Sequence, residues 1–222
     1  MGIGEQVEAV IFDLDGVLID SEPEWEQVRR NYVLERGGSW PEDAQVHLLG
    51  MSTAEWARYL SADLGVNLPP DTVANDVIDQ MAARYADSLP LMPGAGDTLQ
   101  RLRRSLRLAL ASSSPRRLID SVLATAGWRD LFEATVTTDE AGRGKPAPDV
   151  YLSAAGRLEL PPSACAAVED SSNGLRSAAA AGTFVIALPP PRYPPAPAAI
   201  SLAQVVLASL TDLPALGLGG GG

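Results

Sequence analysis

Five short runs of apolar residues constrain the fold more than any other feature of the sequence. They cover residues 7–12, 106–111, 134–137, 164–168 and 183–188. Each run is too short for a stable helix and is followed by polar residues or proline, which is typical of a buried strand. The sequence therefore predicts five buried strands, four of which lead into polar groups.

Helical patterns lie between these runs. Residues 97–104, 116–126 and 175–181 have helical patterns, and we expect Ser114 and Pro115 to be the cap and the first residue of the second helix. Strands that alternate with helices of this length predict βαβ units and a parallel sheet. The expected fold class is therefore α/β.

The stretch from residue 17 to residue 88 has a different pattern. It contains no convincing strand but several amphipathic helices: one covers residues 23–35, one begins at a capping box opened by Ser52, and one follows Asp71. We therefore expect a helical insertion after the first strand. The predicted division is a core of residues 1–16 and 89–216, a helical cap of residues 17–88 and a glycine tail of residues 217–222.

The charge balance bears on possible partners. The chain has 28 acidic and 17 basic residues, which gives a formal net charge of −11. Because no basic surface is left after pairing, we expect no nucleic-acid partner and no anionic membrane partner. No apolar run approaches the roughly 18 residues of a membrane span, and the N-terminus lacks the features of a signal peptide. We expect a soluble, cytoplasmic protein.

Three residue types that often carry chemistry occur once each, as Cys165, His47 and Lys145. These counts exclude a disulfide framework and a Cys/His zinc site, and the spacing excludes a Cys–His dyad. A Ser-His-Asp triad would need His47, which has no nucleophile elbow near it. The chemistry must therefore depend on carboxylates.

Polar residues follow four of the predicted strands. Asp13 follows the first, Ser112 the second, Lys145 lies in the loop after the third, and Glu169 and Asp170 follow the fourth. Ligands of parallel sheets bind outside the carboxyl ends of the strands. We therefore expect these side chains to converge on one edge of the sheet.

The charge at that edge indicates a metal ion. Four negative charges come from Asp13, Asp15, Glu169 and Asp170, and one positive charge comes from Lys145. Like charges about 4 Å apart repel by roughly 4 kcal/mol per pair at an effective dielectric constant near 20. Oxygen ligands without histidine favour Mg²⁺ over zinc or copper. An anionic substrate that coordinates Mg²⁺ directly, such as a phosphorylated metabolite, would then be accepted.

The spacing of Asp13 and Asp15 suggests a mechanism. In an extended chain, residues i and i+2 face the same side, so both carboxyl groups can flank one substrate atom. Asp13 would attack phosphorus to form an aspartyl phosphate, and Asp15 would act as the general acid and base. Ser112 and Ser113 would bind phosphoryl oxygens, and Lys145 would neutralise negative charge.

Four segments of the chain, in order, resemble the four motifs of the haloacid dehalogenase superfamily. They are Asp13-Leu-Asp-Gly-Val-Leu-Ile-Asp-Ser-Glu-Pro, Leu-Ala-Ser112-Ser-Ser-Pro, Lys145-Pro-Ala-Pro-Asp and Val-Glu169-Asp170-Ser-Ser-Asn-Gly174. The similarity is to the cap-type-one branch of sugar-phosphate phosphatases and β-phosphoglucomutases. This resemblance implies a Rossmann-like core with a helical cap. It also implies Mg²⁺ held by Asp13, the backbone carbonyl of Asp15 and Asp170, with Glu169 nearby or as an alternative ligand.

Departures from the family pattern narrow the activity. Mutases of this branch carry a histidine where this chain has Trp25, and an arginine where it has Thr53. Dehalogenases lack an acid at the place of Asp15, and phosphonatases use a cap lysine that residues 17–88 do not contain. We therefore expect a phosphatase acting on a sugar or polyol phosphate, with a phosphosugar mutase as the alternative.

Two alternatives come from other classes of protein. A receiver-type phosphoacceptor domain also combines an acidic cluster, a Ser/Thr and a lysine on a parallel sheet. The length of the chain and the nucleophile on the first strand disfavour it. An inactive binding protein is disfavoured by the intact set of acids.

Other residues have simpler structural explanations. Cys165 is expected in the core, His47 in a solvated or core position, and Asp20 and Glu22 at a helix start near the hinge of the insertion. The aromatic residues Trp25, Trp56 and Tyr59 are expected to pack between helices, and Arg101, Arg103, Arg104 and Arg107 to form a solvated helix face.

Overall fold

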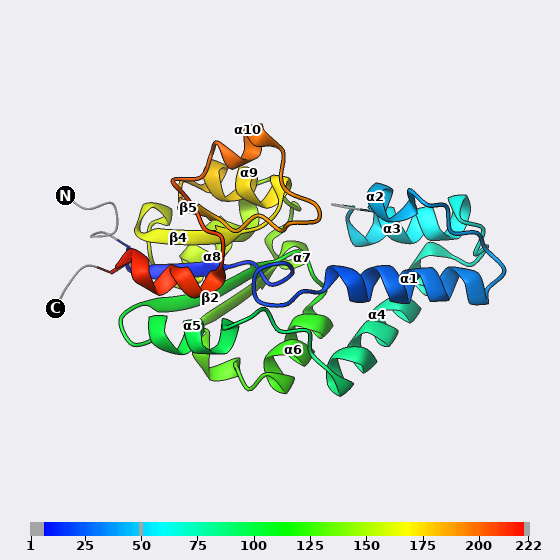
Figure 1. Ribbon diagram of the computed structural model, residues 1–222, viewed down its shortest axis with the longest axis horizontal. Coiled ribbons are helices and arrows are strands. Elements are labelled where there is room, and N and C mark those ends of the chain that lie inside the picture. Colours follow the sequence, from blue (N-terminus) through cyan, green and yellow to red (C-terminus); the bar gives the residue numbers. More distant parts are fainter. Residues whose placement is uncertain (1–6, 49–50, 220–222) are drawn as a thin grey trace.

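A six-stranded, fully parallel sheet forms the centre of the protein, as seen in a computed structural model that describes residues 7–48 and 51–219 (Figure 1). The strand order is β3-β2-β1-β4-β5-β6. The predicted α/β class with a Rossmann-like parallel sheet is confirmed. The strands are β1 (Ala9–Phe12), β2 (Arg107–Ser112), β3 (Ala134–Thr137), β4 (Cys165–Glu169), β5 (Phe184–Ala187) and β6 (Val205–Val206).

The five predicted strands are all present, with ends that differ from the predicted ones by at most two residues. The sixth strand, β6, was not predicted because it contains only two residues and pairs through Ile186 and Ala187 of β5. Such a short strand has no periodicity of its own and forms only because β5 offers an open edge.

Side chains alternate between the two faces of the sheet. Val10 and Phe12 face one apolar core, shared with α5 (Ala95–Leu102) and α6 (Arg116–Thr125). Ala9 and Ile11 face a second core, which is rich in alanine and therefore lets its helices approach the sheet closely. Its helices are α8 (Asp149–Arg157), α9 (Ser172–Ala181) and α10 (Pro197–Ile200). Figure 1 shows α5 and α6 on one side of the sheet and α9 and α10 on the other.

Helix α8 was not predicted from the sequence. Only a polar loop that carries Lys145 was predicted after the third strand, and the nine residues of α8 include Gly156. Its apolar side chains nevertheless lie in the second core. Tertiary packing therefore stabilises a helix whose local sequence signal is weak. The remaining short helical segments of the core are α7 (Thr138–Ala141) and the 3₁₀ turns Arg129–Leu131, Pro162–Ala164 and Leu210–Leu216.

The helical insertion lies at one end of the molecule, away from the sheet (Figure 1). It comprises α1 (Glu22–Glu35), α2 (Ala44–Leu48), α3 (Thr53–Arg58), a π-helical turn (Tyr59–Asp63) and α4 (Pro70–Asp87). The predicted capping box is present, since Ser52 and Glu55 each bond the other's backbone N–H. No strand lies among the described residues between β1 and β2. Within the described part of the chain, no helix is both long and apolar enough to cross a membrane.

Candidate active site

The site lies where the chain reverses its direction of travel across the sheet. From β1 the chain adds β2 and β3 on one side, and it then adds β4, β5 and β6 on the other. Strand β1 pairs with both β2 and β4, so Asp13, Ser112 and Glu169 leave three adjacent parallel strands at the same edge. This is the crevice in which open α/β sheets bind ligands.

Three acids meet at this edge. Asp13, Glu169 and Asp170 each place one carboxylate oxygen so that the three atoms lie within 4.8 Å of one another. The side chain of Asp15 is not part of this group. The four-acid cluster expected from the strand ends is therefore a cluster of three carboxylates.

The Lys145 ammonium joins two of these acids. Its Nζ atom lies 2.6 Å from Oε1 of Glu169 and 3.0 Å from Oδ1 of Asp13, and it donates a hydrogen bond to the carbonyl oxygen of Ala111. The contact between Lys145 and Asp13 is an ion pair whose angles do not fit a hydrogen bond. Oδ1 of Asp13 therefore has no hydrogen-bond partner among the described residues. The lysine side chain is 6% exposed, so this charge acts in a water-poor environment.

Glu169 is the most fully bonded acid of the three. Lys145 and the Tyr151 hydroxyl donate to its Oε1 atom, the latter at 2.6 Å, and the Asp170 N–H and the Ser171 hydroxyl donate to Oε2. Gly174 packs so closely that a Cβ there would overlap the Glu169 carboxylate. The chain thus fixes this carboxylate in one position.

Tyr151 was not among the site residues predicted from the sequence. It lies on α8, the helix that was not predicted, and is fully buried in the second core. Had α8 been predicted, its position six residues after Lys145 would have placed it near the same strand edge. No local motif marks its contact with Glu169.

Burial perturbs the pKa values of this group. Burial raises the pKa of the Asp13 carboxyl to about 7, against the lowering effect of the Lys145 charge. Burial and the charge of Glu169 raise the pKa of Asp170 well above its ordinary value. Burial alone would lower the pKa of Lys145, but the charges of Asp13 and Glu169 raise it above its usual value. Burial and mutual repulsion therefore disfavour the ionised forms of Asp13 and Asp170, and Lys145 only partly offsets this effect.

Asp15 has a separate environment. Strand β1 ends at Phe12, and Asp15 lies in the tight loop that follows, in which Gly16 has a φ of 77°. The hydroxyls of Ser21 and Ser114 each donate to one carboxylate oxygen of Asp15, at 2.5 Å. The prediction that Ser114 caps the second core helix is wrong, because α6 begins at Arg116 and this hydroxyl is bonded to Asp15.

The two predicted phosphate-binding serines differ in exposure. Ser112 is fully buried at the end of β2, and its hydroxyl accepts a hydrogen bond from the Ser114 N–H. Ser113 is exposed. Both precede the N-terminus of α6, where helix dipoles and free N–H groups favour anions.

The helical insertion contributes a second polar group that the sequence analysis did not single out. The Arg29 guanidinium stacks on two indoles, with Cζ 4.4 Å from the ring centroid of Trp25 and 5.0 Å from that of Trp56. The Gln45 amide donates a hydrogen bond to Glu22. The predicted helix packing of Trp25 and Trp56 is confirmed, since both are buried.

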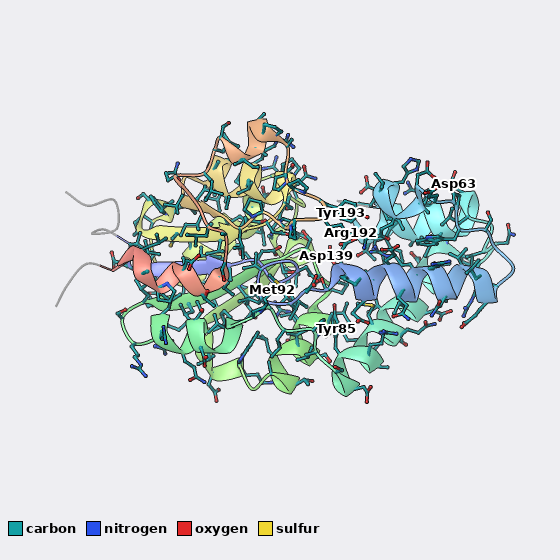
Figure 2. The ribbon with its side chains drawn as sticks, in the orientation of Figure 1. Asp63, Tyr85, Met92, Asp139, Arg192 and Tyr193 are labelled. Atoms are coloured by element: carbon teal, nitrogen blue, oxygen red, sulfur yellow. The ribbon has the colours of Figure 1, made fainter. Side chains whose placement is uncertain are left out.

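Several simpler predictions are also confirmed. Cys165 is fully buried, and the His47 side chain is 55% exposed, 3.5 Å from Asp43. Thr53, at the place where the mutases have an arginine, is the first residue of α3, and residues 49–50 of the loop before it lie outside the described residues. The core and the insertion also touch at an ion pair, in which Arg192 after β5, labelled in Figure 2, lies 3.3 Å from Glu26.

The three-acid group has the chemistry of a hard-cation site. It offers only carboxylate oxygens, which suit Mg²⁺, Ca²⁺ or Mn²⁺. Oδ1 of Asp13 is buried without a hydrogen-bond partner, and the Asp170 carboxylate accepts no hydrogen bond from a described residue. These two acids therefore have free lone pairs for a divalent cation, whereas Glu169 is already bonded.

Known proteins are similar to this chain in sequence and fold. A family model for haloacid dehalogenase-like hydrolases matches residues 7–182. Hexitol phosphatase B of Escherichia coli K12 is 33% identical over 218 residues, 97% of this chain and 98% of that protein. The bifunctional riboflavin kinase/FMN phosphatase of Arabidopsis thaliana is 33% identical over 182 residues, 81% of this chain, which spans about half, 48%, of that protein. The crystal structure of CbbY from Rhodobacter sphaeroides in complex with phosphate has a TM-score of 0.81 and 27% identity, and the match covers 93% of this chain and 96% of that one.

The chain therefore belongs to the haloacid dehalogenase-like hydrolases, as its four motifs predicted. With two phosphatases among these relatives, it is an enzyme of the phosphatase class. This result removes the receiver domain as an alternative.

Proposed function

We propose that the chain is a Mg²⁺-dependent phosphatase that hydrolyses a sugar or polyol phosphate through an aspartyl phosphate on Asp13. One observation supports this above all others: a buried lysine links Asp13 to Glu169, with Asp170 beside them, at the switch point of the sheet. This arrangement provides a nucleophile, a fixed cation and a metal site around one position.

In the first half-reaction, an Asp13 carboxylate oxygen attacks phosphorus and the bond from phosphorus to the leaving oxygen breaks. Protonated Asp15 gives its proton to that oxygen, so the alcohol leaves neutral. Lys145 balances negative charge on Asp13 and on the phosphoryl oxygens. Ser112, Ser113 and the N-terminus of α6 bind those oxygens.

In the second half-reaction, a water molecule attacks phosphorus and Asp15 removes its proton. The bond between phosphorus and Asp13 then breaks, which releases inorganic phosphate and restores the carboxylate. The hydroxyls of Ser21 and Ser114 hold Asp15 in place for both proton transfers. Asp15 therefore acts once as acid and once as base.

Asp13 and Asp170 would hold Mg²⁺, together with the backbone carbonyl of Asp15. Bound there, the ion supplies positive charge that screens the acids from the phosphoryl group. Glu169 orients Lys145 and takes no direct part in metal binding, because Lys145, Tyr151, Asp170 and Ser171 already saturate its oxygens.

Residues 17–88 act as a cap that closes over the substrate, excludes water and selects the organic part. Ion pairs between core and insertion, Arg192 with Glu26 and Arg117 with Asp79, support this arrangement. The mutase alternative is weaker, because Trp25 stands where a mutase has histidine and its indole stacks on Arg29.

Turnover of p-nitrophenyl phosphate with and without Mg²⁺ tests the proposal. We expect Asp13→Asn to reduce turnover at least about 10⁴-fold, because a neutral amide cannot attack phosphorus. Asp20→Asn, a matched change at an exposed acid seven residues along, keeps it within about twofold. Equal turnover by the Asp13→Asn and wild-type proteins would refute the nucleophile. Isomerisation of β-glucose 1-phosphate would favour the mutase.

A further inference from the structure

Arg29 is the one arginine classed as buried among the residues that the structure describes, with 8% of its surface exposed. It lies on α1, and its guanidinium is covered by the indoles of Trp25 and Trp56, whose ring centroids are 6.0 Å apart. Both indoles lie against the guanidinium, but an indole ring gives its N–H groups no hydrogen-bond acceptor. Among the described residues these N–H groups therefore have no hydrogen-bond partner.

No described residue pairs with this charge. No carboxylate lies within 4.0 Å of Arg29, and no described group accepts a hydrogen bond from it. Two other arginines of the insertion have such partners: Arg36 contacts Asp76, and Arg84 contacts Glu24. A buried unpaired cation is costly, so its retention indicates a partner that the folded chain itself does not supply.

The unsatisfied atoms near Arg29 include both donors and acceptors. Nε of Arg29 is a buried donor, Oε1 of Gln45 is a buried acceptor, and the Tyr85 hydroxyl can do both; none has a hydrogen-bond partner among the described residues. Gln45 is joined to the neighbourhood of Arg29 through Glu22, whose charge acts on the guanidinium. Hydroxyl groups both donate and accept, whereas phosphate dianions and carboxylates only accept.

The mixture of donors and acceptors in this group indicates a neutral ligand. Glu22, which accepts a hydrogen bond from Gln45, is the acid whose charge acts most on Arg29. A second phosphate or a carboxylate on the substrate would be repelled by this acid and could not donate a hydrogen bond to Oε1 of Gln45. A neutral polyol lets the guanidinium donate while Glu22 and Gln45 accept.

We infer that Arg29 and Gln45 bind the hydroxyl groups of a neutral polyol leaving group and so select against substrates that carry a second anionic group. This inference rests on the proposed phosphatase function. Arg29 is thus a specificity-determining residue of the insertion. The phosphoryl-transfer chemistry stays with the core.

A matched pair of substrates tests the inference on the unmodified enzyme. Sorbitol 6-phosphate and 6-phosphogluconate are both six-carbon, open-chain and polyhydroxylated, and they differ mainly by the carboxylate at the end remote from the phosphate. We expect wild-type kcat/KM to be at least about tenfold higher for sorbitol 6-phosphate. A preference for 6-phosphogluconate would overturn the inference and make Arg29 an anion receptor.

The Arg29→Met variant removes the charge and the donors but keeps an unbranched, flexible side chain that can still pack against the indoles. We expect kcat/KM for sorbitol 6-phosphate to fall about 10- to 100-fold, and the ratio to p-nitrophenyl phosphate turnover to fall at least about fivefold. Arg30→Met, at the adjacent exposed arginine of α1, is the matched control and keeps both rates within about twofold. An equal loss on both substrates would show that Arg29 has a structural role only.

Binding provides a second measurement that does not depend on turnover. Calorimetric titration of sorbitol 6-phosphate into the Asp13→Asn protein should give a Kd that rises at least about tenfold when Arg29→Met is added. An unchanged Kd would overturn the inference. If no phosphate monoester, p-nitrophenyl phosphate included, is hydrolysed by the wild-type protein, the proposed function itself fails. Hydrolysis without the expected substrate preference would refute only this inference.

Discussion

The sheet edge and the helical insertion each hold a buried cation near two acids, but only the cation at the sheet edge is in contact with its acids. Lys145 lies 2.6 Å from Glu169 and 3.0 Å from Asp13, and the two acids raise its pKa above the usual value. Arg29 has no carboxylate within 4.0 Å, and burial lowers its pKa to about 10. The fold completes one site and leaves the other incomplete.

This difference follows from what each region must do. Phosphoryl transfer needs charges fixed before the substrate arrives, and the saturated Glu169 carboxylate provides that preorganisation. Substrate selection needs groups that gain partners only from the correct ligand, and Arg29 with Gln45 meets that need. Changes in the two regions should therefore have different consequences.

The largest difference is expected when Lys145 is changed. Lys145→Met leaves Asp13 and Glu169 buried without their cation, so kcat/KM for phosphate monoesters should fall about 10³-fold. The loss should be the same for every substrate, whereas the loss expected for Arg29→Met depends on the substrate. Arg143→Met, at an exposed cation two residues away, is the control for a change in total charge. Steady-state kinetics on sorbitol 6-phosphate and p-nitrophenyl phosphate would measure this. A kcat/KM within tenfold of the wild-type value would show that the fixed cation of the core site is not needed for phosphoryl transfer.

The rigidity of the core site can be tested by adding one methyl group. Gly174→Ala places a Cβ against the Glu169 carboxylate, and we expect the free energy of unfolding to fall by about 2–4 kcal/mol. Gly156→Ala is the control within α8, where a Cβ meets nothing within 4 Å, and should stabilise the protein by up to about 1 kcal/mol. Urea denaturation of both variants distinguishes the two cases. Similar values would show that the carboxylate can move.

A smaller effect is expected at the acid and base residue. Ser114→Ala removes one of two hydroxyls that hold Asp15, so kcat should fall about tenfold while KM changes little. The exposed Ser163, with no such contact, provides the Ser163→Ala control. Initial rates over a range of substrate concentrations separate kcat from KM. A change confined to KM would contradict the positioning role.

The smallest effect is expected where the two regions meet. Arg117 of α6 pairs with Asp79 of α4, and both side chains are more than half exposed. Exposed pairs of this kind contribute about 0–1 kcal/mol, so a double-mutant cycle of Arg117→Ala and Asp79→Ala should give a coupling free energy of unfolding in that range. A coupling above about 2 kcal/mol would show that this contact fixes the insertion rigidly against the core.

The sequence carried most of the information about the core site. Short apolar runs fix the strands, and the polar residues that end them meet at one edge because all strands are parallel. Each strand and its polar end can be recognised from consecutive residues. The sequence therefore predicted that Asp13, Lys145, Glu169 and Asp170 converge. It did not predict where Asp15 lies, because its loop turns at Gly16 and the side chain is held by Ser21 and Ser114.

The sequence by itself determined the class of fold and the acids at the carboxyl edge of the sheet. Strands and the polar residues that end them can be recognised from consecutive residues. Only the tertiary structure decided that Tyr151 donates a hydrogen bond to Glu169 and that Arg29 is buried against two indoles without a hydrogen-bond partner among the described residues. Both features depend on which helices pack together. No residue carries that information alone, because burial is set by neighbours that are distant in the chain.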